Sequence, residues 1–561
     1  MTDTKASKDA RGAKPSAAAH QGGARRIAHP GLVLLVIAGA QMMVVLDGTI
    51  VNIALPSMGR YFGKTQTDMT WALNAYTLAF GGLLLLGGRM GDILGRRRMF
   101  VVGLSLFTLG SFLAGIAPSF PLLLAGRAIQ GLGGAIASPT GLSLITTEFE
   151  EGPARTKAIG VYAAVSGAGA ALGLLLGGVL TNYLSWRWVL FVNVPIGLVL
   201  IVGAFLYLRQ SERKVGRFDF VGALLSVAGM VATVFGFIHV ARAGWDNTET
   251  YSVFAAAVVL IALFVFYEAK VVADPMMPMR IFEDKNRSGA YIVMFVVGAA
   301  MFGLFYFITF FVQGVREYSA LKTGFSFLPV ALVIGVVSQV VARMMGKSGP
   351  KPIIVSGTVL LTGSMLWFSR VDTSSGYWGT LLPGMVMLAI GMGCLFVPLT
   401  TAAVSRVANT DAGLASALLN VGQQVGGALG LSVMTTVFGT AGRNYAGEHS
   451  GGLHKQLYQS ANGEQSLVGV IAKKLQSAGN NGLQPGDIKK FVATLPPDQR
   501  ARAAAFFGGP YRDFSRGLLA HASGQGFLMG AVFGLVALVA AVVLINVKKS
   551  EIPDDVVAAA A

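Results

Sequence analysis

Fourteen apolar stretches dominate this sequence, and each is long enough to cross a membrane as a helix. About 20 residues span a hydrocarbon core roughly 30 Å thick. The approximate limits of the stretches are 31–55, 69–90, 98–117, 121–146, 156–180, 187–208, 217–240, 251–271, 288–312, 323–345, 352–369, 377–404, 412–438 and 524–546. A chain with these stretches is predicted to fold as an all-α polytopic membrane protein with 14 transmembrane helices.

The composition excludes several other classes of protein. Hydrophobic residues make up 53% of the 561 residues and charged residues 13%, whereas a soluble domain carries about 25% charged residues. Charge is therefore too sparse for a soluble enzyme, a disordered chain or a nucleic-acid-binding protein, even though the net charge is +17. The single cysteine, Cys394, allows neither an intramolecular disulfide nor a thiolate metal cluster.

The Lys and Arg residues of the short loops predict the orientation, because cytoplasmic loops are enriched in them. If the chain starts in the cytoplasm, the inside loops hold the richer set, which is Arg96, Arg97, Arg98, Arg155, Lys157, Arg209, Arg213, Lys214, Arg217, Arg280, Lys285, Arg287, Lys347 and Lys351. The short outside loops hold Arg60, Lys64, Arg187, Arg242, Arg316, Lys322 and Arg370. Both termini are therefore predicted to be cytoplasmic, with residues 1–29 as a disordered tail and 547–561 as a second tail.

One polar segment, 440–523, separates the last two apolar stretches and is predicted to lie outside the cytoplasm. Loops of this length are uncommon unless they are functional or disordered. We expect short helices with too few large apolar residues for an independent core. The segment either gates the exit or touches an envelope partner, or it is a tolerated insertion.

The sequence lacks the motifs of P-loop NTPases, zinc hydrolases and serine hydrolases. Gly-Lys-Thr at 63–65 and Gly-Lys-Ser at 346–348 each lack the glycine that a P-loop needs five residues earlier, where Met58 and Val341 stand. The zinc-hydrolase pattern HExxH and the serine-hydrolase pattern GxSxG are absent as well. We therefore predict no enzymatic activity, no metal and no cofactor, and an ion gradient as the energy source.

Two ionisable residues lie within apolar stretches and are the main functional candidates. Asp47 is in the first stretch and Arg127 is in the fourth. At about 1.5 Å per residue, both lie roughly 9–12 Å from the same predicted membrane surface. An ionisable residue at such depth is a functional-site hypothesis by default. We predict a proton site at Asp47 with Arg127 as its cationic modulator; the alternative is a structural ion pair or a packing contact.

Five sequence motifs resemble one known family. They are Leu46–Pro56 (LDGTIVNIALP), Gly87–Arg98 (GGRMGDILGRRR), Arg127–Gly133 (RAIQGLG), Trp186–Gly197 (WRWVLFVNVPIG) and Asn420–Gly427 (NVGQQVGG). Together they resemble the fourteen-helix drug:proton antiporters of the major facilitator superfamily, the exporters of the QacA, EmrB and EfpA type. The resemblance covers about residues 30–438 and the last helix.

The resemblance implies a fold and a mechanism. The implied fold has a six-helix bundle at 30–209, two inserted helices at 217–271 and a second six-helix bundle made of 288–439 and 524–546. The implied function is proton-driven export of drugs or natural products such as antibiotics by alternating access, in the bacterial cytoplasmic membrane. In this family the loop between the second and third helices is a conformational latch; the matching residues here are Gly88, Gly91, Asp92, Gly95 and Arg96.

Two features depart from the family pattern. Leu174 stands where the antiporter motif of the fifth helix usually has proline, although the motif glycines Gly169, Gly173, Gly177 and Gly178 are present. The C-terminal half also lacks the membrane acids that help some members to carry cations, which favours a hydrophobic or amphipathic substrate. Polar residues that could line its cavity are Gln41, Asn52, Asn74, Gln130, Asn193, Gln313, Gln339, Asn420, Gln423 and Gln424. For each of them the alternative is an interhelical hydrogen bond.

Protons, the small-molecule substrate and membrane lipid are the expected partners, and we expect no nucleic acid. Two other functions stay open at this point. One is export of a lipid or siderophore, which the absence of cation-binding acids would suit. The other is a non-transporting membrane sensor or scaffold, favoured by the long segment 440–523 and disfavoured by the presence of Asp47 together with the loop motif.

Overall fold

The computed structural model describes residues 29–149, 153–210, 218–273, 275–404, 407, 412–478, 483 and 485–547. The described residues are almost entirely helical, and every predicted apolar stretch falls on a helix. Within the described residues, thirteen helices are long and apolar enough to cross a membrane, and α5 carries a shorter apolar stretch at Ala168–Tyr183. The prediction of an all-α polytopic fold is confirmed. The predicted tails 1–29 and 547–561 lie, apart from residues 29 and 547, outside the described residues.

The first group of helices runs from α1 to α7. Its members are α1 (Pro30–Phe62), α2 (Gln66–Leu94), α3 (Arg96–Ile116), α4 (Phe120–Glu148), α5 (Pro153–Tyr183), α6 (Trp188–Phe191) and α7 (Asn193–Tyr207). Helix α1 packs along α5, and α4 packs between α2 and α3. The helix ends follow local chemistry. Gly63 ends α1 in the left-handed conformation, and Thr65 and Asp68 form a reciprocal capping box at the start of α2.

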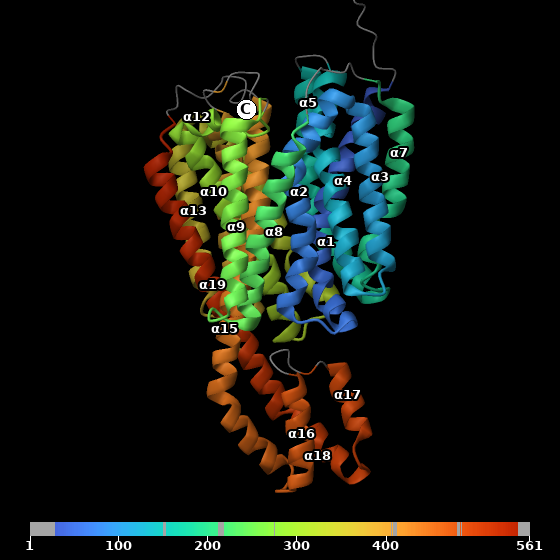
Figure 1. Cartoon of the computed structure of the whole chain (residues 1–561), viewed down its shortest axis with the longest axis vertical. Helices are drawn as coiled ribbons and strands as arrows, with labels where there is room; N and C mark the ends of the chain where they lie inside the picture. Colours follow the sequence, from blue (N-terminus) through green and yellow to red (C-terminus); the bar gives the residue numbers. More distant parts are fainter. Residues whose placement is uncertain are drawn as a thin grey trace, which may run out of the picture.

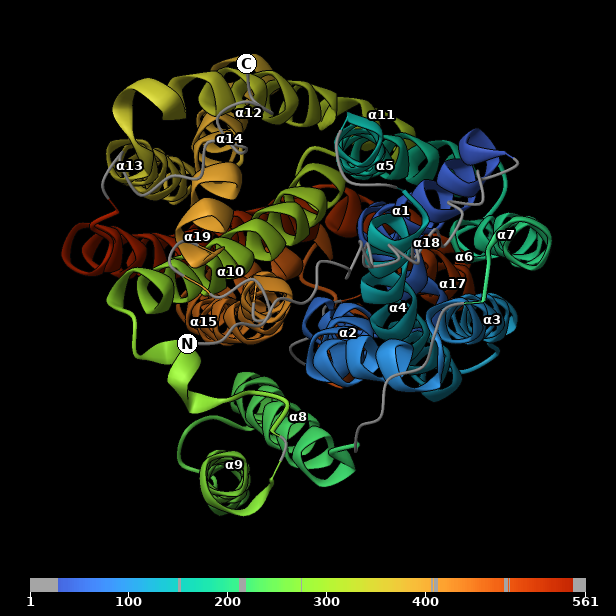
Figure 2. The ribbon, with the colours of Figure 1, turned by 90° about the horizontal axis from the view of Figure 1, so that it is seen from above.

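The second group begins with α10 and closes with the last helix of the chain. Its members are η2 (Met279–Phe282), α10 (Lys285–Gly314), α11 (Ala320–Ser326), α12 (Leu328–Ser348), α13 (Pro350–Phe368), η3 (Tyr377–Leu381), α14 (Leu382–Val404), α15 (Ala412–Ser460) and α19 (Pro510–Leu544). Here α10 packs against α15 and α19, while α13 packs against α14 and α19. The two groups lie side by side, with contacts between α2 and α15 and between α5 and α11 (Figure 1, Figure 2).

A helix pair lies at the edge of the two groups. It consists of α8 (Phe220–Ala243) and α9 (Thr248–Phe266), and α9 continues into the π-helical turn η1 (Tyr267–Val271). Helix α8 contacts α2 and α15 and therefore touches both groups (Figure 2). Helix α9 is the least covered of the membrane-length helices, since only 11% of its apolar window is buried. Most of the α9 surface is thus available to lipid.

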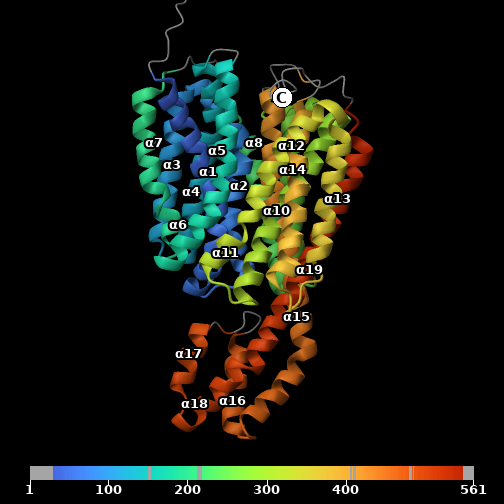
Figure 3. The ribbon, with the colours of Figure 1, turned by 180° about the vertical axis from the view of Figure 1, so that it is seen from behind.

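The described residues of the segment 440–523 form a small helical cap. Helices α15 and α19 project beyond the other helices, and α16 (Gln465–Ala478), α17 (Pro485–Thr494) and α18 (Pro497–Gly508) pack at their projecting ends (Figure 1, Figure 3). The prediction of short helices agrees with this structure. The end of the molecule that carries the cap is called the cap end below.

The prediction that this segment lacks a core of its own is wrong. A separate apolar cluster fills the cap, built from Leu457, Ala461, Leu467, Val468, Ile471, Leu495, Ala503, Phe506, Phe507 and Tyr511. Its members come from α15, α16, α18 and α19 and from Leu495, which follows α17. The projecting ends of the two membrane helices therefore complete a core that the three short helices could not build alone.

Candidate proton-coupling site

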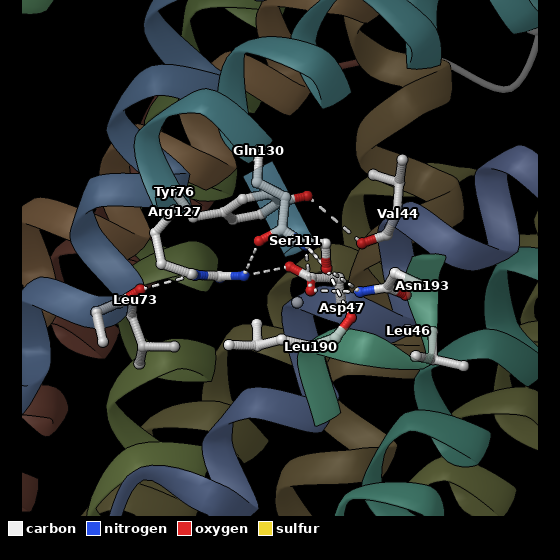
Figure 4. A network of polar contacts seen from close by, with 12 residues as sticks. Val44, Leu46, Asp47, Leu73, Tyr76, Ser111, Arg127, Gln130, Leu190 and Asn193 are labelled. Atoms are coloured by element: carbon white, nitrogen blue, oxygen red, sulfur yellow. Dashed lines mark hydrogen bonds and ion pairs between the residues drawn. The ribbon is translucent and has the colours of Figure 1, made fainter. Parts of the chain in front are cut away.

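An ion pair lies in the interior of the first group of helices. Asp47 of α1 and Arg127 of α4 are 0% and 1% exposed, and Arg127 Nη1 donates to Asp47 Oδ2 at 2.5 Å (Figure 4). The sequence places both residues at similar depth, and the structure brings them into direct contact. Burying two charges is costly unless they are paired and hydrogen-bonded. The surroundings of the pair supply such partners.

Two amide side chains complete the hydrogen bonds of the Asp47 carboxylate. Gln130 Nε2 and Asn193 Nδ2 donate to Asp47 Oδ1 at 2.6 Å and 2.9 Å. Gln130 lies one turn after Arg127 on α4, and Asn193 is the first residue of α7. The sequence suggests both as cavity residues, but the structure places them in the carboxylate network. The arrangement can hold a carboxylate that is neutralised by one guanidinium and oriented by two amides.

Ser111 links this network to a fourth helix, α3. Its Oγ accepts from Gln130 Nε2 and from Asn193 Nδ2, each at 3.1 Å, and donates to Leu190 O at 2.8 Å. Ser111 is fully buried on α3. The sequence analysis did not indicate it, although a hydroxyl within a predicted apolar stretch is a signal that could have pointed to it.

Arg127 is held on its other side by α2. Its Nε donates to Ala72 O at 3.0 Å, and its guanidinium carbon lies 4.5 Å from the centre of the Tyr76 ring. Such a cation–π contact stabilises a cation where water is excluded. Arg127 Nη1 also donates to Gln130 Oε1 at 2.7 Å. Tyr76, like Ser111, belongs to the site although the sequence did not indicate it.

The predicted latch residues lie at the end of α2 opposite the cap end. Arg96 donates twice to Asp92 Oδ1, at 3.0 Å and 3.2 Å, and once to Ser143 O of α4 at 3.1 Å. Gly95, with φ +102°, makes the turn between α2 and α3. A Cβ on Gly91 would lie 2.4 Å from Thr140 of α4, whereas one on Gly88 would have an ordinary contact of 3.5 Å with Pro139. The motif therefore fastens the end of α2 against α4.

The glycines of α5 lie at two close helix contacts. A Cβ on Gly173 or Gly177 would meet backbone oxygens of α1, at 2.7 Å from Leu46 O and 2.6 Å from Ile50 O. Gly169 approaches Met42 of α1. A Cβ on Gly178 would lie 2.8 Å from Ala320 O of α11, in the second group. These glycines allow α5 to approach α1 and α11 closely, as small residues do in membrane helix packing.

The remaining cavity candidates are dispersed. Asn74 donates to Ser432 of α15 at 3.0 Å, which bridges the two groups. Asn52 and Asn420 donate to carbonyls of their own helices, Gly48 O and Ser416 O. Four further candidates contact neighbouring helices: Gln41 bonds with Ser138 and Tyr162, Gln313 with Ile53 O and Gln423 with the Met301 sulfur, and Gln424 lies beside Gly81. Gln339 on α12 is exposed. The structure does not gather these side chains into one cavity.

A polar cavity of about 230 Å³ lies between the two groups at the cap end. It is lined by Ser57, Arg60, Thr181, Asn182, Gln313, Tyr318, Ser319 and Ala320, from α1, α5, α10, α11 and the turn before α11. Gln313 is the cavity candidate that reaches it. Drug-sized ligands usually occupy cavities of about 300–1,000 Å³, so this cavity is smaller than a typical binding site for such a molecule.

Helix arrangement and sequence both relate the chain to known transporters. The sequence profile of the Major Facilitator Superfamily matches residues 37–431. The chain is 43% identical over 422 residues to the puromycin resistance protein of Streptomyces alboniger, and the aligned region covers 74% of this chain and 83% of the relative. It is 39% identical over 411 residues to the cephamycin export protein of Amycolatopsis lactamdurans, which covers 72% of this chain and 85% of the relative.

A solved structure supports the same fold. A bacterial homologue of the human lysosomal transporter Spinster, in an inward-facing and unoccupied conformation, superposes with a TM-score of 0.58 at 17% identity, covering 92% of this chain and 98% of that one. The class that fold and motifs define is that of multi-pass membrane transporters. The chain belongs to the Major Facilitator Superfamily.

Proposed function

We propose that this chain exports antibiotics or similar small molecules across a bacterial cytoplasmic membrane, and that proton entry drives the export. Relatives named for puromycin resistance and cephamycin export support the substrate class. The observation that carries proton coupling is the Asp47 carboxylate, which is 0% exposed and held by Arg127 and two amides. An expensive buried acid of this kind suits a proton relay.

Asp47 exchanges the proton, and Arg127 neutralises the carboxylate when the proton has left. Nη1 of Arg127 donates a hydrogen bond to Oδ2 of Asp47 in this conformation. A proton can bind there only when that contact opens, so protonation and rearrangement of α1 against α4 occur together. A purely structural ion pair is the alternative, but buried ion pairs are weak sources of net stability.

The contacts of α1 offer a route from this site to the second group. The α1 backbone near Asp47 touches Gly173 and Gly177 of α5, while Gly178 of α5 touches Ala320 of α11. A movement of α1 that follows protonation therefore acts on the contact between α5 and α11. Alternating access requires this contact to open and close as the two groups rock.

The polar cavity at the cap end belongs to the exit path. Its volume of about 230 Å³ is small for a drug-sized ligand. The main substrate cavity then forms between the groups when they separate at the opposite end. A hydrophobic or amphipathic substrate fits the scarcity of membrane acids in the second group.

The orientation is part of the proposal. The two bundles (30–209, and 288–439 with 524–546) have the inserted pair 217–271 between them in sequence, both termini face the cytoplasm, and the cap faces outward. Gly469 of α16 is exposed and has open space around it. A cysteine there, in a Cys394→Ala background, should react with an impermeant thiol reagent in intact spheroplasts. Labelling that requires disrupted membranes would contradict the orientation.

Transport into everted vesicles tests the function directly. Puromycin should accumulate when respiration acidifies the vesicle interior, and a protonophore should abolish the accumulation. The matched control is vesicles from cells with the empty vector. Accumulation that needs ATP and survives the protonophore would contradict proton coupling, whereas no accumulation of any tested antibiotic would contradict export.

A further inference from the structure

A pair of buried carboxylates lies outside the Asp47 site, on the helix pair at the edge of the molecule. Asp219 precedes α8 and Glu268 lies in η1, and each is only 3% exposed. Both lie at the end opposite the cap end. The proposed transport mechanism does not use either residue.

Each carboxylate has one oxygen satisfied by the backbone. Asp219 Oδ1 accepts from Gly222 N at 2.8 Å and caps the start of α8. Glu268 Oε2 accepts from Met277 N at 3.0 Å, in the segment that leads to α10. Asp219 Oδ2 and Glu268 Oε1 are buried and have no donor while both groups are ionised.

The two oxygens without donors face the same point. A Cβ on Gly222 would lie 2.5 Å from Asp219 Oδ2 and 2.7 Å from Glu268 Oε1. The two carboxyl groups are close enough for a hydrogen bond between them once one is protonated. Two adjacent buried carboxylates repel each other, and a single shared proton replaces that repulsion with a hydrogen bond.

Asp219 is the charged side chain that acts on Glu268 within the described part of the chain. On the neighbouring elements, Arg89 of α2 donates to Pro275 O at 3.3 Å, while Lys270 of η1 and Arg280 of η2 are exposed. Ala223 of α8 and Met276 belong to one apolar cluster with Leu86 of α2. A metal ion would need more ligands, and no group of three or more His, Cys, Asp or Glu among the described residues could hold one.

We propose that Asp219 and Glu268 form a proton-binding site that holds one proton between Oδ2 and Oε1. The proton ties the start of α8 to η1 and, through Met277 N, to the segment that enters α10. Its loss leaves two apposed negative charges, which push η1 away from α8. The site thus makes the attachment of the α8–α9 pair sensitive to the pH on that side of the membrane. This inference goes beyond the proposed function and needs no transport to be tested.

The test uses the purified full chain in lipid nanodiscs without substrate. Infrared difference spectra between the wild type and Glu268→Gln at neutral pH should show a protonated-carboxyl band that the variant lacks. Glu249→Gln is the matched control, since Glu249 lies at the other end of the same helix with a side chain 62% exposed. The control should keep the band. Identical spectra for the wild type and Glu268→Gln would overturn the proposal.

Thermal unfolding gives a second, independent readout. Because the proton is held only in the folded state, its stabilising effect is present at lower pH and is lost as the pH rises. The Tm of the wild type should therefore fall as the pH rises above the ordinary Asp and Glu pKa values of about 4, and that dependence should be weaker in Glu268→Gln, whose amide keeps a donor towards Asp219. An unchanged dependence would overturn the proposal. So would a Tm that follows the sodium concentration instead of pH, because a cation would then occupy the site.

Discussion

Adding one methyl group at Gly324 should open the contact between the two helix groups at the cap end. The Cβ of alanine there would lie 2.6 Å from Leu174 O of α5. The oxygen belongs to a helix backbone and cannot rotate away, so α5 and α11 must separate. Overpacking of this kind costs about 1–3 kcal/mol. If the contact exists only in the conformation described here, the equilibrium shifts toward the conformation open at the cap end by about 5–150-fold.

Distances between spin labels can measure this shift. One label at Leu184, after α5, and one at Thr373, in the turn after α13, mark exposed positions of the two groups at the cap end. Both are introduced as cysteines in a Cys394→Ala background. In Gly324→Ala the longer-distance population should grow.

The matched control for this experiment is Gly335→Ala in α12, since a Cβ at Gly335 meets nothing within 4 Å. This variant should keep the distance distribution of the parent. Coincident distributions for Gly324→Ala and the parent would refute the argument that this glycine contact holds the cap end closed.

Three further predictions concern other parts of the molecule. Asn193→Ala removes a hydrogen bond to the Asp47 carboxylate, so it should destabilise the protein by about 1.5–3 kcal/mol, visible as a lower Tm; an unchanged Tm would contradict the network. Arg127→Ala leaves a buried charge unpaired at a cost of about 3–5 kcal/mol, whereas Arg127→Lys keeps a cation and should retain more transport. Equally poor transport by both variants would show that the guanidinium geometry matters more than the charge, and wild-type transport by both would remove Arg127 from the site. The hydrogen bond from Ser466, with further help from neighbouring donors, holds the pKa of Glu464 below its usual range. The Glu464 carboxylate therefore stabilises the cap above its unfolded pKa, and this stabilisation is lost as the pH falls. Hydrogen exchange of α16 should become faster in acid in the wild type and less so in Glu464→Gln, and equal acid sensitivity in both would contradict this.

The all-α polytopic fold and the two buried ionisable residues could be predicted from the sequence. A run of apolar residues has a length that a bilayer constrains, and Asp47 and Arg127 stand out within such runs because charge is expensive there. The rotation of each helix about its own axis could not be predicted in the same way. These helices are apolar on most faces, so periodicity does not indicate which face points inward. Gln130 and Asn193 were therefore expected in the substrate cavity, whereas they bond to Asp47.

The cap was misjudged for a related reason. Its large apolar residues are spread over four helices and the turn after α17, and two of those helices begin or end in the membrane. The members within α16 and α18 alone are too few for a core, and Leu457 of α15 and Tyr511 of α19 complete it. Phe506 and Phe507 contact Tyr511, which is near them in sequence, but the same cluster also includes Leu457 of α15, which lies much earlier in the chain. Local sequence carries no signal for that contact.

Proton movement in proteoliposomes that hold the purified protein tests the central claim most directly. A substrate gradient should drive protons across the membrane in the wild type, and a pH-sensitive dye trapped inside would report it. In Asp47→Asn, whose amide cannot exchange a proton, the account predicts no substrate-driven pH change in protein that is still folded. Asp498→Asn in the cap, where the side chain is 70% exposed, should behave as the wild type. Substrate-driven proton movement that persists in Asp47→Asn would contradict the account.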